Sequence, residues 1–187
     1  MEATLQKIPT LFVRDPDDLR RVTREVHPDC AWVLAGEGDP TRKYDGTCVR
    51  LDDAGRWWAR REVKAGKATP TEFVAVQHDS VTGKTVGWEP IEQSSFVKFF
   101  NEAVAGQEFS PGTYELCGPK LNGNPEAYDG HRLVRHETAE VFGDVPRDYD
   151  GLMAWLLAHP EFEGIVWHHP DGRMAKLKRR DALASQS

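Results

Sequence analysis

Residues 46–63 read GTCVRLDDAGRWWARREV. Two runs rich in β-branched and aromatic residues, Gly46 to Leu51 and Arg56 to Val63, flank the turn sequence Asp52-Asp53-Ala54-Gly55. Aspartate favours turns because its side chain bonds the nearby backbone, and glycine accepts a positive φ at little steric cost. The stretch therefore predicts a β-hairpin.

The same signals predict further strands on both sides of this hairpin. Serine, threonine and glycine at 80–83 and His169-Pro170-Asp171-Gly172 provide two more turns. Apolar residues at helical spacing predict a helix over Phe96 to Ala105. A second helix is predicted from about Asp148 or Asp150 through Leu156 and Leu157 to the stop at His159-Pro160. The run Asp15-Pro16-Asp17-Asp18 predicts the start of a short charged helix around Leu19 to Val26. The predicted strands are Ala31 to Ala35, Glu72 to Gln77, Thr85 to Glu89, Gly112 to Cys117, Gly164 to Trp167 and Met174 to Leu177. Strands dominate, so the predicted fold class is α+β with mainly antiparallel sheets.

Size and composition indicate one soluble domain. The chain has 187 residues, of which 39% are hydrophobic and 29% charged. A formal net charge of −6 argues against a protein that coats nucleic acid through a uniformly basic face. Local phosphate binding stays open, because basic residues gather at 56–67 and 176–180. Residues 182–187 are predicted to form a frayed tail.

The N-terminus and the cysteines indicate a cytoplasmic protein. MEATLQKIPTLFVRD resembles neither a signal peptide nor a membrane anchor. Cys30, Cys48 and Cys117 are widely spaced and form no Cys-x-x-Cys pair. We expect small apolar side chains in a reducing compartment.

The segment Lys43-Tyr44-Asp45-Gly46 has the composition of a nucleophilic lysine site. A lysine acts as a nucleophile only when part of its population is unprotonated, and a nearby positive charge promotes that state. Glycine lets the backbone turn sharply beside a phosphate. Taken alone, the segment also fits an ordinary loop lysine before a turn.

Two acids and two lysines follow downstream in apolar strands. Glu115 lies in Tyr114-Glu115-Leu116-Cys117-Gly118, and Glu163 begins Glu163-Gly164-Ile165-Val166-Trp167. An acid in an apolar strand is costly unless it is paired or coordinating, although a single one often faces solvent at a sheet edge. In Lys176-Leu177-Lys178 both lysines share one strand face, where they could meet one phosphate chain. A basic tail is the alternative for that segment.

Four segments occur in order: K-x-D-G at 43–46, Y-E-L-C-G at 114–118, E-G-I-V at 163–166 and K-L-K at 176–178. They resemble motifs I, III, IV and V of the covalent nucleotidyltransferase superfamily, which contains ligases and mRNA capping enzymes. The resemblance extends from about Lys43 to Arg179. It implies the fold of a ligase adenylylation domain, which is ATP-grasp-like, with residues 1–187 as one nucleotidyltransferase domain.

The resemblance also implies a role for each matching residue. Lys43 is similar to the nucleophile that attacks the α-phosphate of a nucleoside triphosphate, and Asp45 with Gly46 to the positions that order its loop. Glu115 resembles the residue that binds a ribose hydroxyl. Glu163 is similar to the ligand of magnesium or manganese, often through water. Lys176 and Lys178 resemble the pair that contacts the α-phosphate.

Details favour RNA ligases within the superfamily. DNA ligases and capping enzymes continue the first motif as K-x-D-G-x-R, whereas Cys48 stands at the arginine position and Arg50 follows on the same strand face. We expect no OB-fold domain after the last motif, unlike in those two classes. The run from Gly118 to Pro125 resembles minimal phage and bacterial RNA ligases.

The predicted function is ATP-dependent joining of RNA ends in RNA repair. Arg60 and Arg61 are candidates for the RNA 5′-phosphate because arginine binds phosphate in a bidentate manner, with a charged surface hairpin as the alternative. Two other functions stay open: an RNA guanylyltransferase of the capping type, and a module that binds nucleotide or RNA without catalysis. The sequence leaves the nucleotide base undecided. A protein partner for end recognition is compatible with so short an enzyme.

Overall fold

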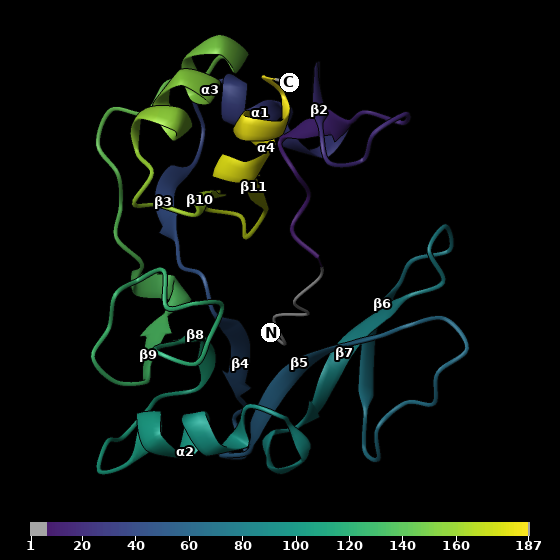
Figure 1. Ribbon diagram of the computed structural model, residues 1–187, viewed down its shortest axis with the longest axis vertical. Helices are drawn as coiled ribbons and strands as arrows, with labels where there is room; N and C mark the ends of the chain where they lie inside the picture. The colour runs from purple at the N-terminus through teal and green to yellow at the C-terminus, as the bar shows by residue number, and fades with distance from the viewer. Residues whose placement is uncertain (1–6, 187) are drawn as a thin grey trace. The chain divides into compact units, whose positions relative to one another are not determined.

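The computed structural model describes residues 7–186, and its contacts divide the chain into two compact units. The first unit is formed by Asp45–Thr138 together with Lys7. The second is formed by Ile8–Tyr44 and the segment from Ala139 onward. All paired strands in the described residues are antiparallel, which confirms the predicted α+β class (Figure 1). Among these residues, no helix combines the length and apolar character that crossing a bilayer requires.

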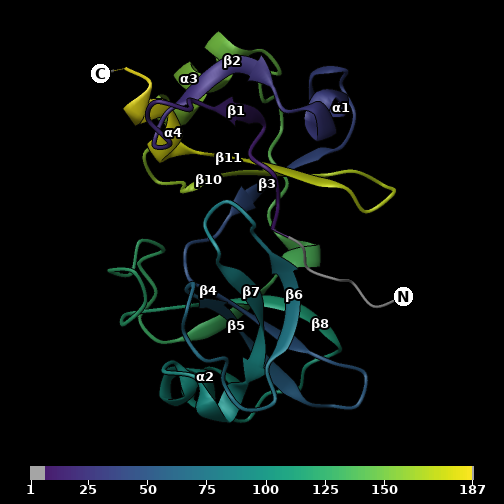
Figure 2. The ribbon, with the colours of Figure 1, turned by 90° about the vertical axis from the view of Figure 1, so that its right-hand side faces the viewer.

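The first unit is built on a six-stranded sheet in the order β6-β7-β5-β4-β8-β9. Figure 2 labels all of these strands except β9. Helix α2 (Val97–Val104) covers one face, where Val49, Leu116 and Phe100 lie in the core. Short 3-10 helices η2 (Ile91–Gln93) and η3 (His136–Thr138) complete the unit. The strands are β4 (Thr47–Leu51), β5 (Trp57–Val63), β6 (Val74–His78), β7 (Thr85–Pro90), β8 (Gly112–Cys117) and β9 (Arg132–Arg135).

The predicted hairpin over residues 46–63 is present as β4 and β5. Asp52 closes its turn by accepting hydrogen bonds from the Ala54 and Arg56 backbone N–H groups. Adjacent tryptophans separate to opposite faces, as alternation along a strand requires. Trp57 packs against the core of this unit, and Trp58 donates a 2.8 Å hydrogen bond from Nε1 to Asp52 on the other face.

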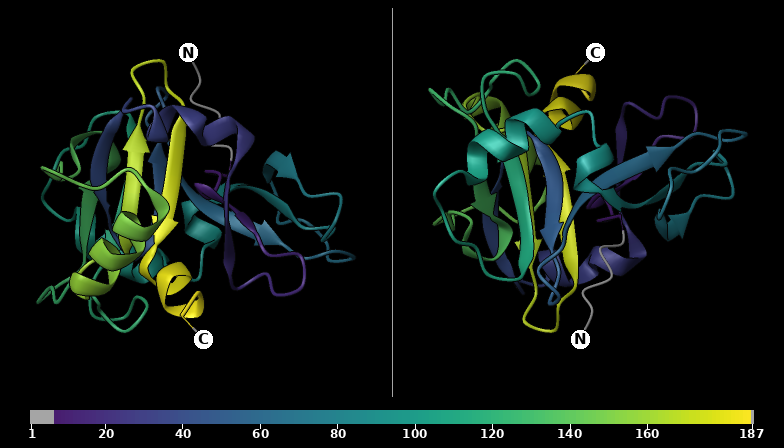
Figure 3. Two further views of the ribbon diagram at one scale, coloured as in Figure 1. Left: turned by 90° about the horizontal axis from the view of Figure 1, so that it is seen from above. Right: turned by 90° about the horizontal axis from the view of Figure 1, so that it is seen from below.

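The second unit contains a three-stranded sheet in the order β11-β10-β3 and the pair β1-β2. Helices α3 and α4 cover one face of the three-stranded sheet (Figure 3), where Leu152, Leu156 and Ala182 join Ile165 and Leu177 in the core. The strands are β1 (Phe12–Arg14), β2 (Val22–Val26), β3 (Asp39–Lys43), β10 (Gly164–His168) and β11 (Met174–Lys178). The helices are η1 (Pro28–Cys30), α1 (Ala31–Leu34), α3 (Tyr149–Ala158) and α4 (Arg179–Ala184).

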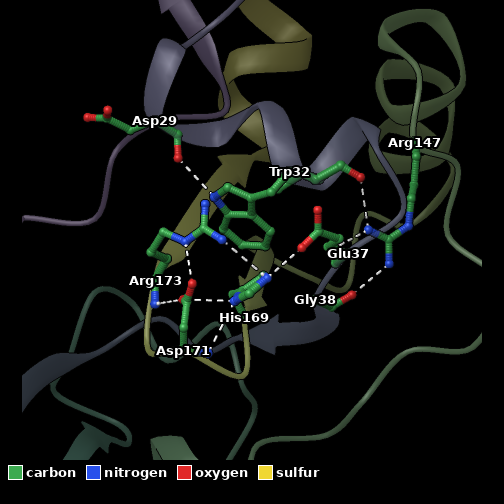
Figure 4. A network of polar contacts seen from close by, with 9 residues as sticks. Asp29, Trp32, Glu37, Gly38, Arg147, His169, Asp171 and Arg173 are labelled. Atoms are coloured by element: carbon green, nitrogen blue, oxygen red, sulfur yellow. Dashed lines mark hydrogen bonds and ion pairs between the residues drawn. The ribbon is translucent and has the colours of Figure 1, made fainter.

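A polar network fixes the turn between β10 and β11 beside α1 (Figure 4). His169 contacts Glu37 and Asp171, each at 2.7 Å, and lies edge-on to Trp32. Arg147 donates hydrogen bonds to backbone carbonyl groups at 33, 37 and 38. Both ring nitrogens of His169 therefore have carboxylate partners, and the role of this histidine is structural.

Two predicted elements are wrong. The segment from Leu19 to Val26 was expected to be helical, but it contains strand β2, because Val22 and Val26 pair with Arg14 and Phe12 of β1. The predicted strand from Ala31 to Ala35 is helix α1, which follows directly on η1 with Pro28 in its first turn.

Lys43 and the C-terminal segment also differ from expectation. Lys43 is the last residue of β3 rather than a loop residue. The tail predicted to begin at Ala182 instead starts within α4, where Ala182 is fully buried. The prediction of a single nucleotidyltransferase domain stays a prediction.

Candidate functional site

Lys43, Glu163 and Lys178 form a compact group in the second unit, which we call the lysine–glutamate cluster. Lys43 Nζ lies 2.9 Å from Glu163 Oε2, and Lys178 Nζ lies 3.7 Å from Glu163 Oε1. Each of the three side chains retains between 16% and 20% of its exposure, so solvent screens these charges only in part. One carboxylate thus bridges two half-buried ammonium groups.

Strand register brings the two lysines together. Gly164 of β10 pairs with Lys43 of β3 on one side and with Lys178 of β11 on the other. A Cβ atom at Gly164 would collide with the Leu177 carbonyl oxygen and lie 2.9 Å from the Lys178 Cα. Glycine at this position therefore permits the close strand contact that holds Lys43 and Lys178 on either side of it.

The opposite face of the same sheet is apolar and rigid. Ile165, Trp167 and Leu177 alternate with the site residues and are fully buried. Close packing of this kind limits side-chain and backbone shifts. Packing on this apolar face therefore holds in place the strands that carry the lysines.

Buried Asp181 fixes the position where β11 ends. Its carboxylate accepts a hydrogen bond from the Lys178 backbone N–H at 3.0 Å and pairs with Arg14 at 2.6 Å. Asp181 lies in the first turn of α4, where a carboxylate satisfies free N–H groups and complements the helix dipole. Sequence reasoning missed Asp181, although an acid three residues after a strand end is a recognisable capping signal.

Burial lowers the pKa of the Lys178 ammonium below its ordinary value. The charge of Lys43 lowers this pKa further, while Glu163 opposes the change. Desolvation and a like charge both favour the neutral amine. Lys178 thus loses its proton more readily than a lysine in water.

Lys176 lies on the same face of β11 as Lys178, opposite Val166 of β10. Its backbone joins the N-terminal segment, donating to the Pro9 carbonyl and accepting from the Leu11 N–H. Strand register therefore places Lys43, Lys176 and Lys178 on one face of the sheet, as alternation along the strand predicted for the lysine pair. Glu163, the residue before β10, contacts Lys43 and Lys178.

Glu115 lies in the first unit and accepts two hydrogen bonds. Its Oε1 accepts from the Gly46 backbone N–H at 3.2 Å, and its Oε2 lies 2.9 Å from His136 Nε2. His136 Nδ1 lies 3.0 Å from Thr113 Oγ1, so both ring nitrogens are engaged. Sequence reasoning did not predict His136 here, because it comes from a separate strand end with no local motif.

The loop after β8 holds Asp45 and Gly46. Asn122 donates to Asp45 Oδ1 at 2.7 Å and to the Gly46 carbonyl at 3.1 Å, and Glu126 accepts from the Asp45 N–H at 3.1 Å. A Cβ atom at Gly46 would collide with the Leu116 carbonyl oxygen. These two positions are therefore ordered by specific contacts, and Asn122 and Glu126 are further residues that the sequence analysis missed.

Arg60 and Arg61 lie on opposite faces of the six-stranded sheet. Arg61 is on the face of Ala59 and Glu89, with its Nη1 3.9 Å from Glu89 Oε1. Arg60 is on the other face, which strand register shows to be that of Trp58 and Glu115. Of the two arginines, Arg60 alone shares a sheet face with Glu115.

The lysine–glutamate cluster has the chemistry to bind and transfer a phosphoryl group. Two ammonium groups can bind phosphate oxygens, and an unprotonated lysine can attack phosphorus. The Glu163 carboxylate fits a magnesium ion because that ion prefers oxygen ligands and keeps water around it. An incoming cation would also replace a lysine as the partner of this carboxylate.

Comparison with known proteins shows similarity to RNA ligases. A family model described as RNA ligase 1 matches residues 97–184. This span includes Glu115, Glu163, Lys176 and Lys178 and begins after Lys43.

Curated relatives of the chain include proteins called RNA ligase 1 from several animals. The protein of Rattus norvegicus is 27% identical over 158 residues, covering 66% of this chain and 46% of the relative. That of Mus musculus is 26% identical with the same coverage. That of Danio rerio is 32% identical over 74 residues, covering 36% of this chain and 23% of the relative. The chain thus spans less than half the length of these relatives.

Proposed function

We propose that this chain is the nucleotidyl-transferring part of an ATP-dependent RNA ligase with a nucleotidyltransferase fold. The observation that carries the proposal is the lysine–glutamate cluster, in which Glu163 bridges Lys43 and Lys178. Similarity to RNA ligase 1 proteins supports the choice of RNA joining. Likeness to minimal phage and bacterial ligases remains a prediction.

In the proposed first step, the unprotonated Lys43 amine attacks the α-phosphorus of ATP. A nitrogen–phosphorus bond forms, the bond from the α-phosphorus to the bridging oxygen breaks, and pyrophosphate leaves. The amine passes one proton to solvent. Lys178 and Lys176 stabilise charge on the α-phosphate oxygens, since cations placed where charge develops lower the barrier. Glu115 holds a ribose hydroxyl.

Two further transfers complete the proposed reaction. An oxygen of the RNA 5′-phosphate attacks the adenylyl phosphorus, and the nitrogen–phosphorus bond breaks to release Lys43. A 3′-hydroxyl then attacks the activated 5′-phosphorus and AMP leaves. The 5′-phosphate meets Arg60, which shares its sheet face with Glu115. A magnesium ion at Glu163, when bound, supplies charge neutralisation for the triphosphate.

Covalent labelling tests this function. The purified chain is incubated with magnesium and α-labelled ATP or GTP, denatured, and separated by electrophoresis. With ATP, we expect label that stays on the protein after denaturation. Acid should release this label, and 5′-phosphorylated RNA should accept it from the undenatured protein. Label from GTP alone would replace the proposal with a capping-type guanylyltransferase. Label from neither nucleotide, in a folded protein that still binds RNA, would leave a non-catalytic binding module.

A further inference from the structure

Three side chains with different metal-binding atoms converge in the first unit. They are Cys48 of β4, Glu115 of β8 and His136, the first residue of η3. The Cys48 Sγ, a Glu115 carboxylate oxygen and a His136 ring nitrogen lie within 4.8 Å of one another. We propose that these residues form a binding site for a thiophilic divalent cation of the zinc class, which we call the Cys48 site.

Strand pairing builds this site from distant parts of the sequence. Cys48 is the direct register partner of Glu115, so both side chains emerge on the same face of the sheet. Glu115 is also paired with Val134, two residues before His136. Because the three residues come from two strands and a 3-10 helix that lie far apart in the sequence, no metal motif is visible in the sequence.

The donor set matches zinc better than magnesium. Zinc takes thiolate, imidazole and carboxylate ligands at about 2.0–2.3 Å, which places tetrahedral donors roughly 3.5 Å apart. The His136 and Glu115 donors lie 2.9 Å apart, and the full group within 4.8 Å, so shifts of about 1 Å complete the geometry. Magnesium prefers oxygen ligands alone. Cation binding releases the Cys48 thiol proton to solvent.

The surroundings hold the donors in place. Cys48 is buried at 8% exposure, and the Glu115 side chain is 13% exposed. The second ring nitrogen of His136 lies 3.0 Å from Thr113 Oγ1, and the second Glu115 oxygen accepts from the Gly46 N–H. Contacts of this kind to the far atoms of metal ligands fix their orientation and strengthen binding. Three protein donors leave a fourth zinc position open.

Occupancy of the Cys48 site has a consequence for the proposed ligase. Glu115 is the residue assigned above to the ribose, so a cation bound to its carboxylate competes with the nucleotide. This consequence rests on the proposed function, whereas cation binding itself does not. Zinc is accordingly expected to inhibit lysine labelling even when magnesium is saturating.

Cobalt absorption tests the Cys48 site directly. The full chain, freed of metal by a chelator, is titrated with Co²⁺, whose bond to a thiolate gives a near-ultraviolet charge-transfer band. We expect one equivalent to produce the band and Zn²⁺ to remove it. Cys48→Ser should abolish the band. His136→Gln should weaken cobalt affinity at least about tenfold, because removing a ligand costs no less than removing the outer-shell partner of a ligand.

The control and the contrary outcomes separate this proposal from the proposed function. Cys30→Ser changes a buried cysteine of the second unit and should keep the band. Absence of the band in the wild type, its persistence in Cys48→Ser, or unchanged affinity in His136→Gln would each overturn the site. Circular dichroism confirms that every variant is folded. Failure of ATP labelling with an intact cobalt band would reject the ligase alone.

Discussion

The lysine–glutamate cluster and the Glu115 region hold their carboxylates in different ways. Glu163 lies between two ammonium groups, at 2.9 and 3.7 Å. Glu115 instead accepts from a backbone N–H and meets a histidine ring. The arrangement around Glu163 depends on opposite charges, whereas that around Glu115 depends on hydrogen-bond geometry. The same substitution is therefore expected to have unequal effects in the two units.

Removal of the nucleophile should give the largest effect. Lys43→Arg keeps a positive charge beside Glu163, but the guanidinium does not deprotonate and cannot attack phosphorus. Covalent labelling from ATP is expected to fall at least about a thousandfold. The matched control is Lys64→Arg at an exposed position, which should label like wild type. Full labelling of Lys43→Arg would move the nucleophile to another residue.

A pair of isosteric changes tests the contrast between the two carboxylates. Glu163→Gln removes the negative charge between two ammonium groups, so labelling should fall by about a hundredfold and require more magnesium. Glu115→Gln keeps an oxygen for the Gly46 N–H, and its amide can donate to His136 Nε2. The labelling rate of Glu115→Gln should therefore fall by less than about tenfold.

The measurement is the labelling rate against magnesium concentration at matched folded fraction. The contrast between the two carboxylates is supported if Glu163→Gln needs a higher magnesium concentration for half-maximal labelling than Glu115→Gln does. Equal losses with unchanged magnesium curves would show that charge plays no special part at Glu163, and would remove it from the metal role.

Sequence alone predicted the hairpins in which an apolar, β-rich run lies on each side of a recognisable turn. The hairpins over residues 46–63 and 164–178 join neighbouring strands through short turns, so pattern and turn chemistry suffice. The segment from Leu19 to Val26 was misassigned although its partner strand is also close along the chain. Asp15-Pro16-Asp17-Asp18 has the composition of a helix start, whereas the pairing of Val22 with Arg14 decides the structure of the segment. Tertiary contact overrides local propensity there.

The candidate site shows the same limit. Motif order singled out Lys43, Glu163 and Lys178, yet their contact depends on pairing between β3 and β10, which joins residues more than a hundred positions apart. His136 lies outside every motif, and Asn122 lies in the run from Gly118 to Pro125, which gave it no role; both reach their partners only through the fold. Residues that meet only in the folded protein show no recognisable spacing in a single sequence.

Arg60 and Arg61 provide a smaller test within the first unit. Arg60→Ala should slow transfer of AMP from Lys43 to 5′-phosphorylated RNA by about tenfold, because it removes a bidentate phosphate donor from the Glu115 face. Arg61→Ala, on the opposite face, is the matched control and should change transfer less than about twofold. Single-turnover transfer from the isolated adenylylated protein measures both. A larger loss in Arg61→Ala would assign the 5′-phosphate to the other face.

The smallest expected effect concerns pH and Lys178. Its pKa is lowered in the folded protein by burial and by Lys43, relative to the ordinary value of 10.5. Between the lowered pKa and 10.5 the unfolded chain binds more protons at this residue, so its contribution to stability improves as pH rises, by at most about 1.4 kcal/mol per pH unit. Below the lowered pKa, the cost of burying the charged amine is fully present.

Lys178→Met removes this titration while keeping a side chain of similar length. The difference in unfolding free energy between wild type and Lys178→Met, from urea unfolding at a series of pH values, should therefore shift in favour of wild type as pH rises toward 10.5. Exposed Lys64→Met supplies the control, with a flat difference. Glu163→Gln should strengthen the trend, since Glu163 opposes the lowered pKa of Lys178. A flat difference for Lys178→Met would mean that Lys178 keeps an ordinary pKa, and that the lysine–glutamate cluster gains its chemistry from position alone.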